Sequence, residues 1–375
     1  MNILVLNWQD IRNPLGGGAE VHLHEIFRRI AARGHRVTLY CSRFEGAPAE
    51  EVIDGIRVLR EGRRNTFNYH VWPRYRSRFR HEQYDVVVDD LNKIPFFTPL
   101  FVREPLVGIV HHLFGRSIFA EVSLPAGTYV AGAEWLAMRL YRSIPTAVVS
   151  ESTRSELLTN GFSSERLHLV PNAIDSAIFH TTGAARPSAP LIGYLGRMKK
   201  YKSIDHLLRA FAIVRREHTD ARLMLVGDGD VRPALADLAA QLDLGTAAQF
   251  TGFVSEEEKV RLLNQMHVVV NPSAKEGWGL TVIEANACGV PVVASDVPGL
   301  RDSVVDGQTG FLYEYGNIEQ LAEKLGLLLR DGHLRTRMAG EALTWGSSFN
   351  WDRSADAMIA LLESTIRAHG AIRGR

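Results

Sequence analysis

The sequence predicts an α/β protein with two domains, each built around a parallel β-sheet. At 375 residues the chain is too long for one ordinary core, and two domains of roughly 150–200 residues are expected. Short β-branched runs alternate with longer amphipathic segments almost from end to end, a pattern typical of repeated strand–helix units. A single stretch rich in small residues and proline, 181–190, interrupts this alternation and indicates a linker.

The β-branched runs predict six strands in each half of the chain. In the first half these are Ile3–Leu6, Arg36–Tyr40, Val86–Val88, Leu106–Val110, Ala147–Ser150 and Leu167–Val170. In the second half they are Leu191–Leu195, Arg222–Val226, Gln249–Phe250, Val268–Asn271, Pro291–Ala294 and Gly310–Leu312. The predicted divisions are an N-terminal domain at 1–180, a linker at 181–190, a C-terminal domain at 191–350, and a final helix at 351–375. The hypothesis for that helix is that it packs back on the N-terminal domain.

The composition narrows the class of protein. A net charge of +1 argues against a dedicated nucleic-acid binder, which would carry a broad basic excess. Only Cys41 and Cys288 are present, in apolar settings, so we expect reduced thiols rather than a disulfide framework. The first residues lack the basic flank of a signal peptide, and no apolar run is long enough to span a membrane. We therefore expect a cytoplasmic protein, with peripheral contact to the inner face of the cell membrane left open.

The strongest motif lies between Asn271 and Pro291. A buried strand is followed by a glycine-flanked loop that holds Glu276, and then by a short helix that carries Glu284 and ends at Gly289. Backbone N–H groups of Gly279, Leu280 and Thr281 at the helix start would meet phosphate oxygens, assisted by the helix dipole. Glu284 could accept hydrogen bonds from a ribose diol, and Glu276 from sugar hydroxyls. The alternative is a surface helix with two solvated glutamates.

The same motif resembles the signature of glycosyltransferase family 4. Two glutamates separated by seven residues lie within Glu-Gly-aromatic-Gly and precede Ala-x-Ala-x-Gly-x-Pro-Val. Further matches, in order along the chain, are Gly16-Gly-Gly-Ala-Glu20, Ser150-Glu-Ser-Thr153, Pro171-Asn-Ala-Ile-Asp175, Gly196-Arg197 with Lys202, and Asp296-Val-Pro-Gly299. The resemblance implies a retaining enzyme of the GT-B fold, in which two Rossmann-like domains face each other across a donor-binding cleft. The first domain would bind the acceptor and the second the nucleotide sugar.

The resemblance also assigns roles to residues outside the motif. It implies that Arg197 and Lys202 clamp the donor diphosphate, which agrees with the negative charge that develops on a departing phosphate. For Arg197 an inter-domain salt bridge is the alternative. The flexible loop Gly16, Gly17 and Gly18 would lie near the donor phosphate and the acceptor, or form only a tight turn. No G-x-G-x-x-G follows it, so a conventional dinucleotide site is not predicted.

Two histidines, His111 and His112, end the strand Gly108-Ile-Val. The resemblance suggests that one of them contacts the donor sugar or the reaction centre; His111 is favoured because it follows the strand directly, and a structural histidine is the alternative. No Cys or His partners lie at zinc-ligand spacing, so no metal is expected. No residue stands out as a covalent nucleophile.

A basic and aromatic stretch runs from Arg57 to Arg80. It contains Arg57, Arg60, Arg63, Arg64, Arg74, Arg76, Arg78 and Arg80 against one acid, Glu61, with Tyr69, Trp72, Tyr75 and Phe79 interleaved. Arginines attract anionic head groups and aromatics enter the interface, so reversible membrane contact is the hypothesis, with Phe96, Phe97 and Phe101 adding to that face. The alternative is a solvated basic face with core aromatics. A nucleic-acid patch has no supporting motif elsewhere.

Together these observations predict a metal-independent, retaining hexosyltransferase that uses a nucleotide-diphosphate-sugar donor and needs no cofactor. The expected acceptor is a saccharide or a lipid-linked molecule in cell-envelope polysaccharide or glycolipid synthesis. Three alternatives remain: a nucleotide-sugar epimerase of the same architecture, an inactive nucleotide-sugar-binding relative, and, with least support, an NAD-dependent oxidoreductase. Motifs shared by a family do not specify the base, the sugar, the acceptor or the linkage.

Overall fold

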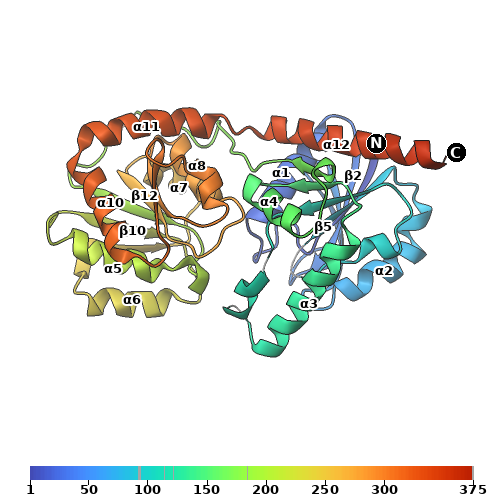
Figure 1. The fold of residues 1–375 in the computed structure, drawn as a ribbon, viewed down its shortest axis with the longest axis horizontal. Helices are drawn as coiled ribbons and strands as arrows, with labels where there is room; N and C mark the ends of the chain where they lie inside the picture. Colours follow the sequence, from blue (N-terminus) through green and yellow to red (C-terminus); the bar gives the residue numbers. More distant parts are fainter. Residues whose placement is uncertain (92–93, 114, 121, 184, 374–375) are drawn as a thin grey trace. The chain divides into compact units, whose positions relative to one another are not determined.

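The computed structural model describes residues 1–91, 94–113, 115–120, 122–183 and 185–373 (Figure 1). The chain divides into two compact units, of which the first comprises Met1–Asn172 with Trp351–Arg375 and the second Ala173–Asn350. The predicted architecture of two parallel-sheet α/β units is confirmed.

In the described residues the first unit contains one sheet in the order β3-β4-β2-β1-β5-β6-β7-β8. Its strands are β1 (Asn2–Leu6), β2 (Arg36–Arg43), β3 (Glu50–Ile53), β4 (Ile56–Arg63), β5 (Val86–Leu91), β6 (Leu106–Val110), β7 (Thr146–Val148) and β8 (Leu167–Leu169). The second unit contains a sheet in the order β11-β10-β9-β12-β13-β14. Its strands are β9 (Leu191–Leu195), β10 (Arg222–Val226), β11 (Ala248–Gly252), β12 (Val268–Asn271), β13 (Val292–Ser295) and β14 (Gly310–Tyr313). All neighbouring strands run parallel except β3 and β4.

The α-helices of the first unit are α1 (Gly18–Ala32), α2 (Asn68–Ser77), α3 (Leu124–Leu140), α4 (Glu151–Thr159) and α12 (Trp351–Arg373). Those of the second unit are α5 (Ile204–Val214), α6 (Arg232–Gln241), α7 (Glu256–Leu263), α8 (Leu280–Ala287), α9 (Leu300–Ser303), α10 (Ile318–Arg330) and α11 (Gly332–Ser347). Short 3-10 turns lie at Phe79–His81, Thr98–Leu100, Gly115–Ala120, Ser164–Arg166, Lys200–Lys202 and Gly245–Ala247. None of the helices in the described residues is long and apolar enough to cross a bilayer.

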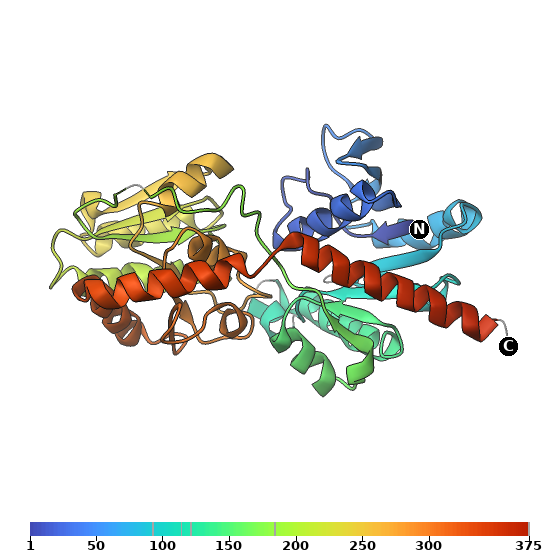
Figure 2. The same cartoon turned by 90° about the horizontal axis from the view of Figure 1, so that it is seen from above.

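The final helix, α12, belongs to the first unit, along which it lies in Figure 2. Arg33, at the end of α1, is 2.6 Å from the Asp356 carboxylate on α12, and the Ser354 hydroxyl donates a hydrogen bond to the Pro171 carbonyl. The chain leaves this unit after Asn172, earlier than the predicted linker at 181–190. The reason is that Ile174 and Phe179 are already buried in a hydrophobic cluster of the second unit.

Each predicted strand overlaps an observed one, but the sequence analysis overlooked the β3–β4 hairpin. Its turn is Asp54-Gly55, with φ of 47° and 83°. Both values are left-handed, as a tight two-residue hairpin of this kind requires, and Asp-Gly is the dipeptide that supplies them at least cost. The hairpin places Arg57 and Arg60, part of the predicted basic stretch, within β4.

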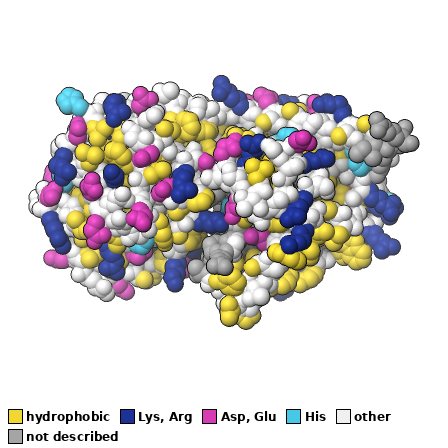
Figure 3. Space-filling model, viewed as in Figure 1, with side chains coloured by type: hydrophobic (Ala, Val, Ile, Leu, Met, Phe, Trp, Pro, Cys, Tyr) yellow, Lys and Arg dark blue, Asp and Glu magenta, His cyan; other side chains and the backbone are white. Residues whose placement is uncertain are grey.

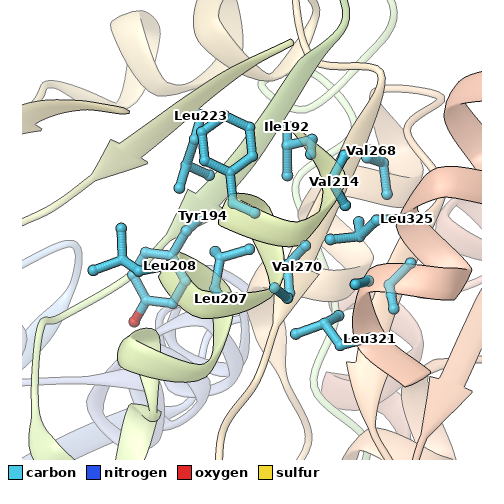
Figure 4. Packing of buried hydrophobic residues seen from close by; sticks show 14 of the residues in the cluster. Ile192, Tyr194, Leu207, Leu208, Val214, Leu223, Val268, Val270, Leu321 and Leu325 are labelled. Atoms are coloured by element: carbon cyan, nitrogen blue, oxygen red, sulfur yellow. The ribbon is translucent and has the colours of Figure 1, made fainter. Parts of the chain in front are cut away.

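An apolar core covers one face of the second sheet. Side chains of β9 and α5, including Ile192, Leu207 and Leu208, pack against Leu321 and Leu325 of α10 (Figure 4). Complete burial of a leucine side chain stabilises the fold by about 1.5–3 kcal/mol relative to exposure. A second cluster, which includes α8, covers the other face. This double cover holds the carboxyl ends of β9 and β12 in place.

Candidate functional site

Most of the predicted site residues lie in two loops of the second unit. One follows β9 and contains Arg197 and Lys202, and the other follows β12 and contains Glu276. Strands β9 and β12 are hydrogen-bonded neighbours, so their carboxyl ends meet at the same edge of the sheet. The Ala274 amide donates to the Tyr201 carbonyl at 2.8 Å, which ties the two loops together. This edge is where open parallel sheets bind ligands.

Lys202 and Glu276 form an ion pair at this edge, through Nζ and Oε1. Both side chains are mostly buried, with 16% and 14% of their surface exposed. Burial acts to lower the pKa of Lys202, but the Glu276 carboxylate outweighs it, so this pKa is raised above its ordinary value. The Ser273 hydroxyl lies 2.8 Å from the same Glu276 oxygen and fixes its position. Lys202 therefore carries a positive charge at this edge of the sheet.

Glycines make the loop after β12 possible. Gly279 caps the N-terminus of α8 with φ of 84°, and a Cβ there would lie 2.8 Å from the Leu300 side chain. A Cβ on Gly299 would lie 2.3 Å from the Glu276 carbonyl. Only glycine therefore permits this close approach. No side chain caps α8, and its first residues, Leu280 and Thr281, are half-buried beside the Glu276 loop.

Glu284 lies on α8, whereas Glu276 is in the loop before the helix, as the sequence analysis considered. Glu284 Oε1 is 2.9 Å from Nζ of Lys259, on α7. Its other oxygen, Oε2, is buried and has no hydrogen-bond partner among the described residues. A buried carboxylate oxygen without a donor is costly, and a ligand hydroxyl would satisfy it. Lys259 also lies over the Phe179 ring, 4.6 Å from its centroid.

The turn after β9 carries three more cations, of which Arg197 and Lys200 are exposed. Lys199 is bound to Asp230 at 3.0 Å, so it does not share the environment of Lys202. The glycines of Val226-Gly-Asp-Gly229 have a packing role. A Cβ on Gly227 would lie 2.0 Å from the Gly196 carbonyl, and one on Gly229 would lie 2.1 Å from the Met198 carbonyl. The two turns are therefore packed backbone against backbone.

The predicted glycine loop of the first unit is more ordered than a flexible loop. The Gly16 amide donates to the Asn13 carbonyl, Gly17 caps α1, and Gly18 is the first residue of that helix. The Glu20 carboxylate accepts the Gly17 amide at 2.6 Å. Burial, opposed by this hydrogen bond, raises the pKa of Glu20. An anion bound here would have to compete with the Glu20 side chain for the Gly17 amide.

His111 forms a buried pair with an aspartate that the sequence analysis overlooked. Its Nε2 lies 3.2 Å from Oδ1 of Asp90, on the adjacent strand β5. Burial tends to lower the pKa of His111, but the Asp90 carboxylate overcomes it and raises that pKa. The His111 ring also contacts His22 edge to face, at 5.0 Å between centroids. His112 is only half-buried, so the structure distinguishes the two histidines by environment.

One feature of the sequence could have identified Asp90 as a candidate site residue. The run Val-Val-Val-Asp-Asp-Leu places two carboxylates in an otherwise apolar strand, and the predicted strand ended too early, at Val88. Asp89 is fully buried, accepts hydrogen bonds from Thr98 and Tyr141, and has a pKa raised by burial to about 6. Lys259 had no such signal, because a lysine on an amphipathic helix is ordinarily solvated.

The stretch from Arg57 to Arg80 divides into paired and unpaired arginines. Four arginines are bound to carboxylates: Arg57 to Glu50, Arg60 to Asp10 and Glu51, Arg74 to Glu61, and Arg78 to Glu82. Of these five carboxylates the sequence analysis counted only Glu61. The predicted aromatic face is also smaller. Tyr75, Phe79 and Phe96 are buried, whereas Tyr69 and Trp72 are exposed.

A hollow of about 500 Å³ in the first unit lies elsewhere, between α4, β8 and α12. Leu167, His168 and Leu361 are among its lining residues, and none of the predicted site residues lines it. The predicted site residues therefore lie outside this hollow.

Comparison with known proteins shows the family to which the chain belongs. The model of the family "Glycosyltransferase Family 4" matches residues 16–178, and that of "Glycosyl transferases group 1" matches residues 178–345. The chain belongs to glycosyltransferase family 4. Its GT-B fold is likewise that of sucrose-phosphate synthase from Thermosynechococcus elongatus, with a TM-score of 0.80 and 21% identity over 98% of this chain and 100% of that one.

One curated relative of this family 4 member and one further structure of similar fold are informative. D-inositol 3-phosphate glycosyltransferase from Nocardia farcinica is 32% identical over 244 residues, which is 61% of this chain and 54% of the relative. The match thus spans about half the length of that curated relative. The Anabaena protein HepE, solved in complex with UDP-glucose, has a TM-score of 0.76 and 20% identity, over 97% of this chain and 100% of that one.

Proposed function

We propose that this family 4 member transfers a hexose-type sugar, with retention, from a nucleotide-diphosphate sugar to an acceptor hydroxyl. The observation that carries the proposal is the grouping at one sheet edge of Lys202, Glu276 and the start of α8, which no side chain caps. On the same helix, Oε2 of Glu284 has no hydrogen-bond partner among the described residues. Cations, backbone N–H groups and carboxylates are the groups that a diphosphate, a ribose and a sugar would need.

In the proposed mechanism the donor diphosphate takes the place of Glu276 as the partner of Lys202. Glu276 then becomes available to accept hydrogen bonds from the sugar hydroxyls, and Glu284 Oε2 accepts one from the ribose. The bond from the anomeric carbon to the phosphate oxygen breaks, and its electron pair moves to that oxygen. Arg197, Lys202 and the N–H groups of Gly279, Leu280 and Thr281 stabilise the charge that develops there.

The acceptor hydroxyl attacks on the face that the diphosphate leaves, which gives retention. Its proton passes to the departing phosphate oxygen, so the step needs no covalent enzyme intermediate. We propose that His111, held by Asp90, contacts the donor sugar or the reaction centre, and that the Gly16–Gly18 turn lies near the phosphate. Because Arg197 and Lys202 supply the positive charge, the reaction would need no protein-bound metal.

We propose that the acceptor is a saccharide or lipid-linked molecule of cell-envelope polysaccharide or glycolipid synthesis. The similar proteins support a glycosyl donor, but their names give different molecules: one is a D-inositol 3-phosphate glycosyltransferase and another a sucrose-phosphate synthase. HepE was solved with UDP-glucose, so UDP-glucose is the first donor to test.

Thermal-shift binding across UDP-, GDP-, ADP- and dTDP-sugars tests the proposal. We expect one donor to stabilise the protein. The affinity for that donor should fall at least about tenfold in Arg197→Ala and in Glu284→Ala, because each variant lacks a charged hydrogen-bonding group. Lys199→Ala is the matched control, since Lys199 lies in the same turn but is bound to Asp230. A folded protein that no donor stabilises, or equal stabilisation of Glu284→Ala, would contradict the proposed site. Product analysis after incubation with donor alone distinguishes an epimerase, which alters the sugar, from a transferase.

A further inference from the structure

An unusual helix in the first unit is α3, whose outward side is apolar. Of its 17 residues only Glu134 and Arg139 are charged, and Leu124, Tyr129, Trp135 and Leu136 are exposed. A helix on the surface of a water-soluble protein ordinarily presents polar residues to solvent and apolar ones to the core. Helix α3 buries some apolar residues and exposes others. Exposing apolar side chains to water costs free energy, and a partner that covered them would remove this cost.

Helix α2 extends this apolar surface. Tyr69 and Trp72 on α2 are exposed, and the hydroxyl of Tyr69 lies beside that of Tyr129 on α3, a contact that, together with burial, raises the pKa of Tyr129. We call the following six residues the α2–α3 face: Tyr69, Trp72, Leu124, Tyr129, Trp135 and Leu136. The exposed fraction of these residues ranges from 41% to 72%. Figure 3 shows apolar side chains gathered over α2 and α3, with basic side chains nearby.

Basic residues accompany the α2–α3 face. Arg63 ends β4 and Arg64 follows it, whereas Arg76 lies on α2 and Arg80 lies just after that helix; all four are exposed. Within the residues that the structure describes, none of these four side chains forms a salt bridge, in contrast to the paired arginines of the same stretch. Arg139 lies over the Trp135 ring, 3.4 Å from its centroid. Unpaired arginines beside exposed tryptophan and tyrosine form a surface complementary to a layer with negative charge outside and hydrocarbon inside.

We propose that the α2–α3 face docks on the surface of an anionic lipid bilayer. Tryptophan and tyrosine favour the boundary between head groups and hydrocarbon, because each has an apolar body and a polar end. Arginine side chains gain from the negative potential of anionic lipids. Contact is superficial, since no described helix is suited to crossing the bilayer. The docking surface includes α3, which the sequence analysis did not consider, and excludes the four paired arginines.

Flotation of the full chain with lipid vesicles tests this proposal. We expect binding to vesicles that contain phosphatidylglycerol, much weaker binding to pure phosphatidylcholine, and loss of binding at high salt. The double variant Arg63→Gln/Arg64→Gln should bind about 25-fold more weakly, or about fivefold for each arginine. The double variant Trp72→Ser/Trp135→Ser should lose at least about tenfold, because it removes the side chains that enter the interface.

Leu136→Ser and Leu169→Ser provide a matched pair, since both leucines are 41% exposed but Leu169 lies on β8, outside the α2–α3 face. Only Leu136→Ser should weaken flotation.

The proposal is overturned if the wild-type chain does not float, or if the tryptophan variant floats as the wild type does. It is also overturned if size exclusion shows a dimer that Trp135→Ser dissociates, because a second copy would then cover the face. Nucleotide-sugar binding is measured on the same variants, so a failure of the proposed donor site is recognised separately.

Discussion

The two units of the chain place their ionisable side chains in different parts of otherwise similar parallel sheets. Among the described residues, the aspartates, glutamates and arginines that are buried as whole residues all lie in the first unit: Asp10, Glu20, Arg60, Asp89 and Asp90. The second unit buries none of these types, and its two half-buried ion pairs, Lys202–Glu276 and Lys259–Glu284, involve the loop and the helix that follow β12.

The two units also differ in how many large apolar side chains they expose. In the described residues the second unit exposes few large apolar side chains, namely Ile178, Phe253 and Tyr315, whereas the first exposes the whole α2–α3 face. Burying charge and exposing apolar groups both cost free energy. The second unit is therefore an apolar scaffold that holds charged side chains at one edge of its sheet. The first unit carries costs that a function, such as acceptor or membrane contact, would explain.

The largest expected effect is the difference in stability between truncating a buried aromatic side chain in the second unit and truncating an exposed one in the first. Phe211 is fully buried in the core of the second unit, so Phe211→Ala should lower the free energy of unfolding by about 3–5 kcal/mol. Trp135 on α3 is 58% exposed, and Trp135→Ala should change it by less than about 0.5 kcal/mol. Urea denaturation measures both. A large loss for Trp135→Ala would mean that α3 is packed rather than available for docking.

Lys202→Ala should have the next largest effect. If Lys202 stabilises the departing phosphate as proposed, its removal is expected to reduce kcat about 10²–10³-fold, the cost typical of losing one such donor. Lys199→Ala should change kcat less than about twofold, because an exposed ion pair contributes little. Steady-state transfer kinetics provide the comparison. Equal losses in the two variants would indicate that the whole basic turn, rather than the Lys202–Glu276 pair, supports catalysis.

Asp89→Asn tests the cost of a buried carboxylate in the first unit. The folded-state pKa of Asp89 is about 6, above the ordinary value of 3.8, so the folded state binds a proton that the unfolded state has lost between these values. Stability therefore falls as pH rises from about 4 to about 6, and the cost is fully present above that range. Asparagine imitates the protonated form. Asp89→Asn should stabilise the protein on the order of 2 kcal/mol at pH 8 and not near pH 4.

Melting curves of both proteins across this pH range provide the measurement. Asp54→Asn, at an exposed carboxylate of the β3–β4 turn, is the control and should not reproduce the same pH dependence. Parallel curves for wild type and Asp89→Asn at every pH would contradict the assigned pKa.

Chelation should have the smallest effect. If Arg197 and Lys202 replace a metal in neutralising the diphosphate, treatment with EDTA should leave the transfer rate within about twofold of the untreated rate. A rate that EDTA abolishes and Mg²⁺ or Mn²⁺ restores would show that the donor reaches the second unit as a metal complex.

The alternation of most strands and helices and the loops of the second unit could be predicted from the sequence. These features are local: β-branched runs favour strands, and Gly279 and Gly289 bound a short helix wherever they occur. It also placed Glu276 in a loop and Glu284 on a helix. The Asp54-Gly55 hairpin was equally local and was overlooked, although the dipeptide predicts it.

Which charged side chains form ion pairs became known only from the folded structure. Arg60 finds Asp10 across 50 residues, Lys202 finds Glu276 across 74 and Lys259 finds Glu284 across 25, separations that no periodicity encodes. The same folding sorted the arginines of Arg57–Arg80 into paired and exposed groups and left the apolar side of α3 uncovered. The physical reason is that pairing and burial depend on distances in space, which sheet order and helix packing set after local structure has formed.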